Sequence, residues 1–495
     1  MSLLKQKAVR GIAWSAIGNW GDQLISFLVL IVLTRLLGPE SFGLVGMATV
    51  FTAFVGLFAE QGLGRAIVQR KDLEEAHLST AFWTNLAVGS GLTLIGILLA
   101  PATAALYHEP ELTLIVALLS TNFLVTALSS TQQALFEREL NFQALSTRRL
   151  VAAVAGGIAG ILAAILGAGV YALVIKTLVT GMIGVILLWR ISTWRPKLEY
   201  SKRHLRDIFN FGATMMGVRF TNFVRTRLDD FLIGLFLGPT ALGYYVVAYR
   251  LARLALDMFT TLIGGVAVTT FSRIQDDLIR LRRAFMKSTQ LVALITFPIF
   301  TGMMILAKEL IVFFSGEHWL PSVRPMQILS IASFTLTMQF VNSYLIIATG
   351  KPAQLLRINI VCMVITAAAF TWSVRSGIGS VATAYTAVNA SFFFVYLFVA
   401  HRILEFDLRK YFIQMLWPAA ASGIMAIAVL LLTRSIHQFE IALSVRIFAA
   451  VSLGIFAYGA SMLIFQRSVY SDFREAVLAI LPVKTDPYER IQELF

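Results

Sequence analysis

Cysteine is nearly absent from this sequence, and charged residues are scarce. Cys362 is the only cysteine among 495 residues, so an intrachain disulfide is excluded. Charged residues make up 14% of the chain, whereas soluble domains carry about a quarter. No long hydrophilic segment separates the apolar runs, so the sequence predicts neither a separate soluble domain nor a large catalytic loop. We therefore expect a protein that is not an enzyme.

Histidine is also rare, and its distribution argues against a metal centre. The chain contains six histidines, at positions 77, 108, 204, 318, 401 and 437. No two of them have the short spacing that zinc ligands show in sequence. The sequence therefore predicts no metal site and no bound cofactor.

Apolar residues dominate what remains. They account for 58% of the chain, and the mean hydropathy is +0.77. An apolar run of about 18 residues or more is long enough to cross a bilayer as a helix. The sequence thus predicts an all-α, polytopic membrane protein. Its expected fourteen transmembrane helices lie at about 12–37, 41–65, 77–101, 111–136, 144–166, 169–190, 207–236, 240–268, 285–307, 322–348, 353–374, 379–401, 410–433 and 444–466.

Positive charge is distributed unevenly between the two sides of these helices. With the N-terminus on the cytoplasmic side, 29 of the 41 lysines and arginines fall in cytoplasmic segments and six in outer ones. Cytoplasmic loops of membrane proteins carry such an excess. We therefore expect both termini in the cytoplasm, and the net charge of +14 requires no nucleic-acid partner.

One short motif occurs twice. LLGPESFGL begins at Leu36 and FLGPTALGY at Phe236, an offset of 200 positions. Six helices separate the copies, which predicts two six-helix lobes in parallel repeat, a plan that transporters use to build a binding site between halves. The predicted parts are an N-lobe at 1–200, a C-lobe at 201–405, two additional helices at 406–470 and a cytoplasmic tail at 471–495.

Polar residues gather on one face of the seventh predicted helix. This stretch, RFTNFVRTRLDDF, spans residues 219–231, and the offset of 200 places polar residues of the first helix in matching positions. Both polar faces are expected to point at a shared aqueous cavity. The candidate substrate-binding residues are Arg219, Arg250, Lys176, Arg225, Arg253, Asn19, Asp22, Asn222, Thr226, Asp229 and Asp230.

A structural ion-pair network is the alternative interpretation of these charges. Arg225 and Asp229 stand at i,i+4, and Arg227 and Asp230 at i,i+3, which are spacings that favour pairing along a helix. Mid-membrane ions cost about 2.5–3.5 kcal/mol each on insertion scales, so a packing role alone does not explain their number. The six lysines and arginines assigned to neither side of the membrane outnumber the four aspartates of the same spans, which favours an anionic ligand. These aspartates are Asp22, Asp229, Asp230 and Asp257.

Several stretches together resemble a known family. LTRLLGPESFGLVGMATVF, GLGRAIVQRKDLEEAHLSTAFW, LDDFLIGLFLGPTALGYYVVAYRLARL, FSRIQDDLIRLRRAF and FSGEHW occur in order. They are similar to the polysaccharide-transport (Wzx-type) flippases of the MATE-like MOP superfamily, in the branch of the colanic acid and succinoglycan exporters. The resemblance covers about residues 1–470.

The resemblance implies a flippase in the bacterial inner membrane. It implies that undecaprenyl-pyrophosphate-linked oligosaccharide passes from the cytoplasmic to the periplasmic leaflet by alternating access, with a polysaccharide polymerase and a chain-length regulator as partners. Related lipid II flippases carry an arginine–aspartate pair in the first helix, whereas this helix offers Asn19 and Asp22 without an arginine. Arg219, helped by Arg250 and Lys176, is the hypothesised diphosphate ligand.

Two other functions remain open from the residues. A cation-coupled multidrug antiporter of the same superfamily would favour an acidic cavity, for which Asp22 is the main support. A membrane polymerase or glycosyltransferase acting on lipid-linked sugars would need catalytic groups in a long outer loop, and no such loop is expected.

Overall fold

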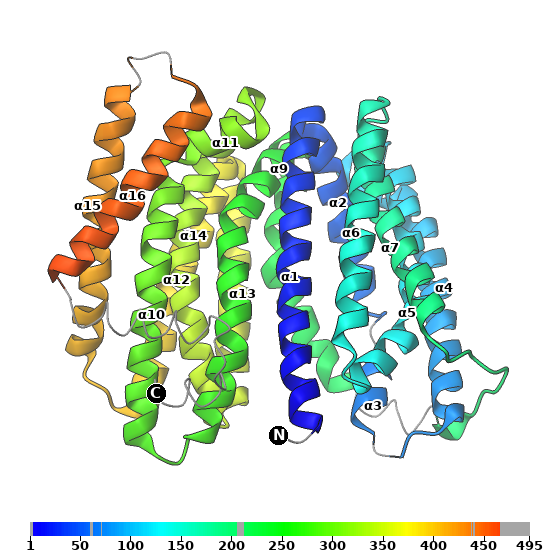
Figure 1. Ribbon diagram of the computed structural model, residues 1–495. Helices are drawn as coiled ribbons and strands as arrows, with labels where there is room; N and C mark the ends of the chain where they lie inside the picture. Colours follow the sequence, from blue (N-terminus) through cyan, green and yellow to red (C-terminus); the bar gives the residue numbers. More distant parts are fainter. Residues whose placement is uncertain are drawn as a thin grey trace. The chain divides into compact units, whose positions relative to one another are not determined.

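The computed structural model of the protein is built from helices (Figure 1). It describes residues 3–59, 63–70, 72–204, 212–436, 438 and 441–465. Within the helices, the side chains of residues 3–10, 12–13, 212–219, 255, 257–266, 269 and 465 are outside that description. The described residues contain α-helices and two short 3-10 helices but no strand, which confirms the predicted all-α class.

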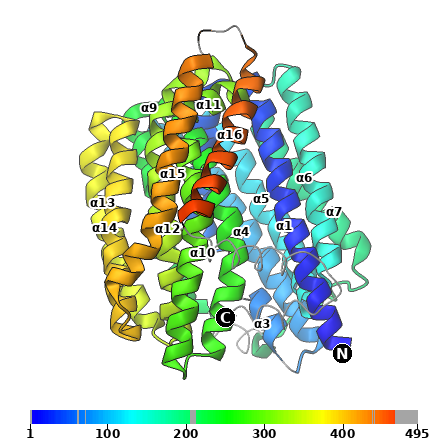
Figure 2. The same cartoon turned by 60° about the vertical axis from the view of Figure 1, so that its left-hand side comes forward.

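The chain forms two compact units, Met1–Val246 and Val247–Phe495. Figure 2 gives a second view of the same helices. The first unit contains α1 (Leu3–Leu36), α2 (Pro39–Gly56), α3 (Leu63–Gln69), α4 (Glu75–Tyr107), α5 (Leu112–Arg138), α6 (Phe142–Ile165), α7 (Tyr171–Ile191) and the first part of α9 (Gly212–Arg273).

The second unit begins within α9 and carries the remaining helices. These are α10 (Leu278–Ile305), α11 (Ala307–Ser315), η1 (Glu317–Ser322), α12 (Val323–Ala348), α13 (Pro352–Ser373), η2 (Val374–Ser376), α14 (Ile378–Leu404), α15 (Leu408–Ile436) and α16 (Leu443–Phe465). In this unit α13 lies beside α14, and α15 beside α16 (Figures 1 and 2).

Thirteen helices of the described part are long and apolar enough to cross a membrane. One of them, α9, is two helices that meet at Gly238, whose φ of 80° and ψ of 178° are not helical. Glycine adopts this positive φ without the steric cost of a side chain, and Pro239 then begins the next helix in a position that proline tolerates. The prediction of about fourteen transmembrane helices is therefore confirmed, and the chain is a multi-pass membrane protein.

The two copies of the repeated motif pack against each other within the first unit. A Cβ atom on Gly43 would overlap the backbone carbonyl of Pro239, and one on Gly243 would overlap the carbonyl of Pro39. Each copy thus presents its glycine to the proline of the other, the reciprocal pattern of a two-fold contact. This packing brings the ends of both helix pairs together.

The additional helices α15 and α16 belong to the second unit. Tyr411 of α15 stacks on Phe285 of α10, with ring centroids 6.2 Å apart. The hydroxyl of Tyr458 in α16 donates a hydrogen bond of 2.7 Å to the backbone carbonyl of Leu294 in α10. The predicted tail at 471–495 lies outside the described residues.

The boundary between the units differs from the predicted boundary between the lobes. The sequence repeat placed the lobe boundary near residue 200, whereas contacts divide the chain after Val246. The first half of α9 contacts α2 and α4: Phe223 packs on Phe54 at 5.7 Å, and Phe231 on Tyr107 at 6.0 Å. The division into two six-helix lobes stays a prediction.

Candidate functional site

Close packing of α1 on α6 positions a polar cluster on one face of the first helix. A Cβ atom on Gly18 would overlap the Ser146 side chain, so the helices approach closely where glycine faces serine. The Ser146 hydroxyl donates a hydrogen bond of 2.7 Å to the backbone carbonyl of Trp14. Arg149 follows Ser146 by about one helical turn and therefore lies beside the next polar residue of α1, Asn19.

Arg149 joins this cluster although it was not among the residues predicted from the sequence. Its guanidinium donates a hydrogen bond to Oδ1 of Asn19. In the sequence it counts among the cytoplasmic charges, because it stands near the start of its helix. The part of α1 from Gly11 to Thr34 contains no arginine, and α6 supplies one from 130 positions away.

Lys176 completes this cluster from a third helix. The positive charges of Arg149 and Lys176 both act on the half-buried carboxylate of Asp22. Lys176 comes this close because α7 packs tightly on α6: a Cβ atom on Gly160 would stand 2.8 Å from the Cβ atom of Lys176. The cluster of Asn19, Asp22, Arg149 and Lys176, here called the α1 cluster, carries two positive charges and one negative charge.

The polar stripe of α9 is only partly described. Arg219 lies within α9, but its side chain is outside the described part of the chain, so its predicted role stays a prediction. Asn222 is exposed, and the hydroxyl of Thr226 donates a hydrogen bond of 2.8 Å to the backbone carbonyl of Asn222. Thr226 therefore already satisfies its hydroxyl within the helix.

The acidic end of this stripe is paired differently from what the spacing predicted. Arg227 and Asp230 form the predicted i,i+3 ion pair, with 3.1 Å between Nη1 and Oδ2. The predicted pair of Arg225 and Asp229 was wrong, since no ion pair joins them in the part of α9 whose side chains are described. Asp229 instead accepts a hydrogen bond of 3.0 Å from the hydroxyl of Tyr245.

Burial explains this choice of partner. Asp229 is 4% exposed and Tyr245 is fully buried, whereas Arg225 is only half-buried. Tyr245 stands in the second half of α9, after the non-helical Gly238. Its hydroxyl reaches Asp229 in the first half of the same helix. We call the group of Asp229, Asp230, Arg227 and Tyr245 the α9 acid cluster. It contains two carboxyl groups and one positively charged guanidinium.

Arg250 and Arg253 lie in the second unit. Arg250 is exposed. Arg253 donates a hydrogen bond of 2.5 Å to the hydroxyl of Tyr249, and its guanidinium stands 5.6 Å from the centre of the same ring. Tyr249 packs edge-on against Tyr385 at 6.3 Å.

A small cavity between α9, α12 and α14 is lined by Tyr249, Arg253 and Tyr385. Its volume is about 10 Å³, and Ser333, Leu329 and Leu336 complete the wall. Such a volume holds about one water molecule. The cavity is therefore too small for a sugar ring, and within the second unit Arg253 is held by aromatic packing.

The structure thus brings Asn19, Asp22 and Lys176 together and gives Arg253 a different, aromatic environment on another element. The signal for Arg149 was weak in the sequence, because an acid such as Asp22 indicates a cationic partner without identifying it. The shared cavity expected between the polar faces of the two lobes stays a prediction.

Comparisons with known proteins bear on the family and the fold of this chain. The model of a family described as "Polysaccharide biosynthesis protein" matches residues 32–324. The teichuronic acid biosynthesis protein TuaB of Bacillus subtilis (strain 168) is 25% identical over 464 residues, which cover 92% of this chain and 95% of TuaB. The succinoglycan biosynthesis transport protein ExoT of Rhizobium meliloti (strain 1021) is 26% identical over 312 residues, 63% of each chain.

A solved structure shares the fold. The lipid II flippase MurJ, in an inward closed conformation, matches with a TM-score of 0.77 at 14% identity, and the match covers 93% of this chain and 100% of MurJ. At this identity the likeness shows the fold alone. Several family-level expectations from the sequence are therefore confirmed: the fold, the membrane class and the relation to polysaccharide transport proteins.

Proposed function

Because the chain belongs to the polysaccharide biosynthesis protein family, whose model matches residues 32–324, we propose that it is a flippase for lipid-linked oligosaccharides. Its substrate is an oligosaccharide repeat unit carried on undecaprenyl pyrophosphate. The observation that carries this proposal is the α1 cluster, which holds a net positive charge on candidate membrane spans.

The chemistry of the α1 cluster suits a diphosphate. Arg149 offers a planar fork of donors that matches phosphate oxygens, and Lys176 adds a second positive charge. Ions placed within a membrane cost about 2.5–3.5 kcal/mol each on insertion scales, so cations in excess of acids imply an anion that visits them. The amide of Asn19, which accepts from Arg149, holds the guanidinium in place until that anion arrives.

The names of the similar proteins support the same substrate class. ExoT is named as a transport protein of succinoglycan biosynthesis, and MurJ as a flippase of lipid II. We carry from them to this chain only the class, a glycan bound to a lipid carrier. As part of this proposal, transport involves no covalent catalysis and no cofactor.

Orientation and partners are further parts of the proposal. The excess of positive charge on one side supports an inner-membrane protein with both termini in the cytoplasm and transport toward the periplasmic leaflet. A polysaccharide polymerase and a chain-length regulator are the partners that would receive the flipped repeat unit.

Reconstitution tests this function directly. The purified protein is placed in vesicles that contain an undecaprenyl-pyrophosphate-linked oligosaccharide with a fluorescent sugar. Glycan that reaches the outer leaflet is then measured by its accessibility to an added glycosidase. We expect transport above that of protein-free vesicles, and competition by undecaprenyl pyrophosphate but not by the free oligosaccharide. Transport equal to that of empty vesicles for every lipid-linked glycan tried would overturn the proposal.

A further inference from the structure

The segment that follows α7 runs back along the start of α4. The backbone N–H of Lys197 donates to Oγ of Ser79 at 3.1 Å, and the backbone N–H of Ser201 donates to Oγ1 of Thr80 at 3.2 Å. The Lys197 ammonium pairs with the carboxylate of Glu75. These contacts hold residues 192–204 against α4 and thereby bring His204 to the first turn of α4.

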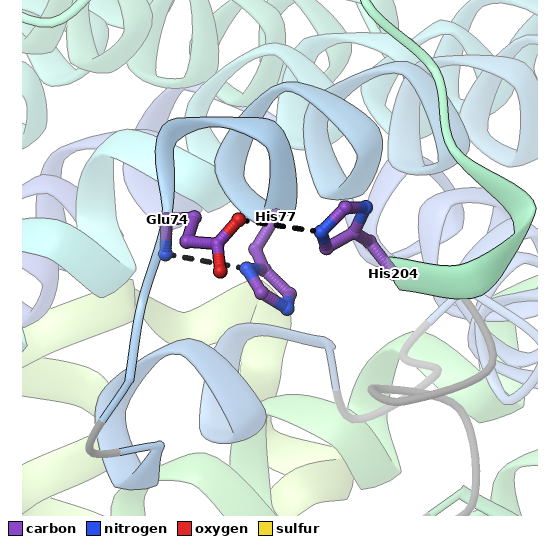
Figure 3. Close-up of side chains that lie close together, drawn as sticks. All are labelled: Glu74, His77 and His204. Carbon is purple, nitrogen blue, oxygen red and sulfur yellow. Dashed lines mark hydrogen bonds and ion pairs between the residues drawn. The ribbon is translucent and has the colours of Figure 1, made fainter.

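Three potential metal ligands meet at this point (Figure 3). Glu74 and His77 stand at the start of α4, and His204 comes from the segment after α7. Nε2 of His204 lies 3.5 Å from Oε2 of Glu74, and the rings of His77 and His204 meet edge-on with centroids 4.3 Å apart. One ligand atom from each residue lies within 4.8 Å of the others.

The hydrogen bonding of the two rings is compatible with ligation. Nδ1 of His77 accepts a hydrogen bond of 3.2 Å from the backbone N–H of Glu74, so this nitrogen presents a lone pair that a metal ion could take over. Nδ1 of His204 is buried and has no hydrogen-bond partner among the described residues. The other ring nitrogen of His204, Nε2, faces Glu74 and is the one available to a metal ion (Figure 3).

We propose that Glu74, His77 and His204 form a binding site for a divalent transition-metal ion, with Zn²⁺ as the best fit. Two imidazoles and one carboxylate are a recurrent zinc ligand set, with a fourth position open to water. Zinc holds such atoms at about 2.0–2.2 Å, roughly 3.4 Å from one another, so ligand atoms that now lie within 4.8 Å of one another need to approach by up to about 1.4 Å. His77 is 1% exposed, which fixes one ligand, and the exposed Glu74 leaves the site open to solution.

Bound metal would clamp the segment at residues 192–204 to the first turn of α4. This goes beyond the hydrogen bonds already present because a metal joins three side chains at once. The spacing of the histidines predicted no metal site, and that prediction is revised because the fold brings together residues 127 positions apart. The site is separate from the α1 cluster and does not depend on the proposed transport function.

Metal binding can be measured on the full-length purified protein without any substrate. The protein, free of any histidine tag and stripped with a chelator, is titrated with Co²⁺ and Zn²⁺. We expect one ion per chain, a visible absorption spectrum of tetrahedral Co²⁺ that Zn²⁺ abolishes, and a rise in the unfolding midpoint of about 2 °C or more with Zn²⁺ in excess.

Variants separate a metal site from a merely structural cluster. Glu74 caps the N-terminus of α4, and its backbone N–H donates to His77 in that cap. His204→Ala leaves this cap intact and should abolish the Co²⁺ spectrum and the Zn²⁺-dependent rise, and Glu74→Gln should weaken binding. His318→Ala, at an exposed histidine of the second unit, is the matched control and should bind as the unaltered protein does. Absence of stoichiometric binding, or a Zn²⁺ effect that survives in His204→Ala, would overturn the proposal and leave a helix cap with a histidine–glutamate contact.

Discussion

The α1 cluster and the α9 acid cluster place carboxylates within candidate membrane spans in opposite ways. Asp22 is half-buried and faces cations from two other helices, Arg149 and Lys176. Asp229 is 4% exposed and is held by a neutral hydroxyl, that of Tyr245. The first arrangement has more positive than negative charge, and the second has more acids than bases.

This difference is the one expected between a ligand-binding site and a contact that stabilises the fold. A partly exposed cluster with surplus cations gains when an anion enters, because the anion supplies the charge that the protein lacks. A buried hydrogen bond between an acid and a hydroxyl gains nothing from a ligand, and breaking it leaves a buried polar group unsatisfied. We therefore propose substrate contact for the α1 cluster and a structural role for Asp229.

The largest effect on transport is expected at Arg149. Arg149→Ala removes the charge-assisted hydrogen bonds that we propose to the diphosphate. Such bonds contribute about 1.5–3 kcal/mol each, so transport in vesicles should fall by about 10- to 100-fold. Arg149→Lys should recover only part of this loss, because an ammonium lacks the planar fork of donors.

The matched control for Arg149 is Arg409→Ala, at an exposed arginine at the start of α15. This variant should transport normally at an equal amount of protein. If Arg149→Ala transports as well as this control, the α1 cluster does not bind the substrate. The proposed functional difference between the α1 cluster and the α9 acid cluster would then be wrong.

The next effect is on stability and falls on the α9 acid cluster. Asp229→Ala leaves the Tyr245 hydroxyl buried without its acceptor, which costs about 1–3 kcal/mol of unfolding free energy. The measurement is the midpoint of thermal unfolding in detergent. Tyr245→Phe breaks the same hydrogen bond from its other end, so the double variant should lose less than the sum of the two single losses. Strict additivity would show that this hydrogen bond does not couple the two residues.

A smaller effect is expected at the acid of the α1 cluster. Asp22→Asn removes the negative charge and raises the net charge of the cluster from one to two positive charges. The diphosphate should then bind more tightly and leave more slowly, with a lower apparent KM and a maximal rate reduced by several-fold. The concentration dependence of transport in vesicles separates these two changes. A raised KM at unchanged maximal rate would mean that Asp22 helps binding and does not promote release.

The smallest effect is expected at Arg225. Because Asp229 is paired with Tyr245, Arg225→Ala strands no buried partner, and surface-like changes of this kind usually stay within about 0.5 kcal/mol. Its unfolding midpoint should match that of the unaltered protein, in contrast to Asp229→Ala. An equal loss of stability in Arg225→Ala and Asp229→Ala would support the ion pair between Arg225 and Asp229 that the i,i+4 spacing predicted.

Local chemistry was enough to predict the helices of this chain. Apolar runs of membrane length define the spans, and the Gly38-Pro39 and Gly238-Pro239 pairs mark where two of them end. The pair of Arg227 and Asp230 was also predictable, since i,i+3 neighbours on a helix meet without help from the rest of the fold. All of these features depend on residues within a few turns of one another.

The sequence by itself therefore determined the all-α class, the number of membrane helices, the repeated motif and the presence of surplus cations. Only the tertiary structure decided which cation meets which acid. Arg149 reaches Asn19 because Gly18 lets α6 approach α1, and Tyr245 reaches Asp229 because α9 turns back at Gly238. His204 meets His77 because hydrogen bonds tie residues 192–204 to α4. Contacts between distant segments depend on the packing of whole helices, and helical spacing along one segment carries no information about them.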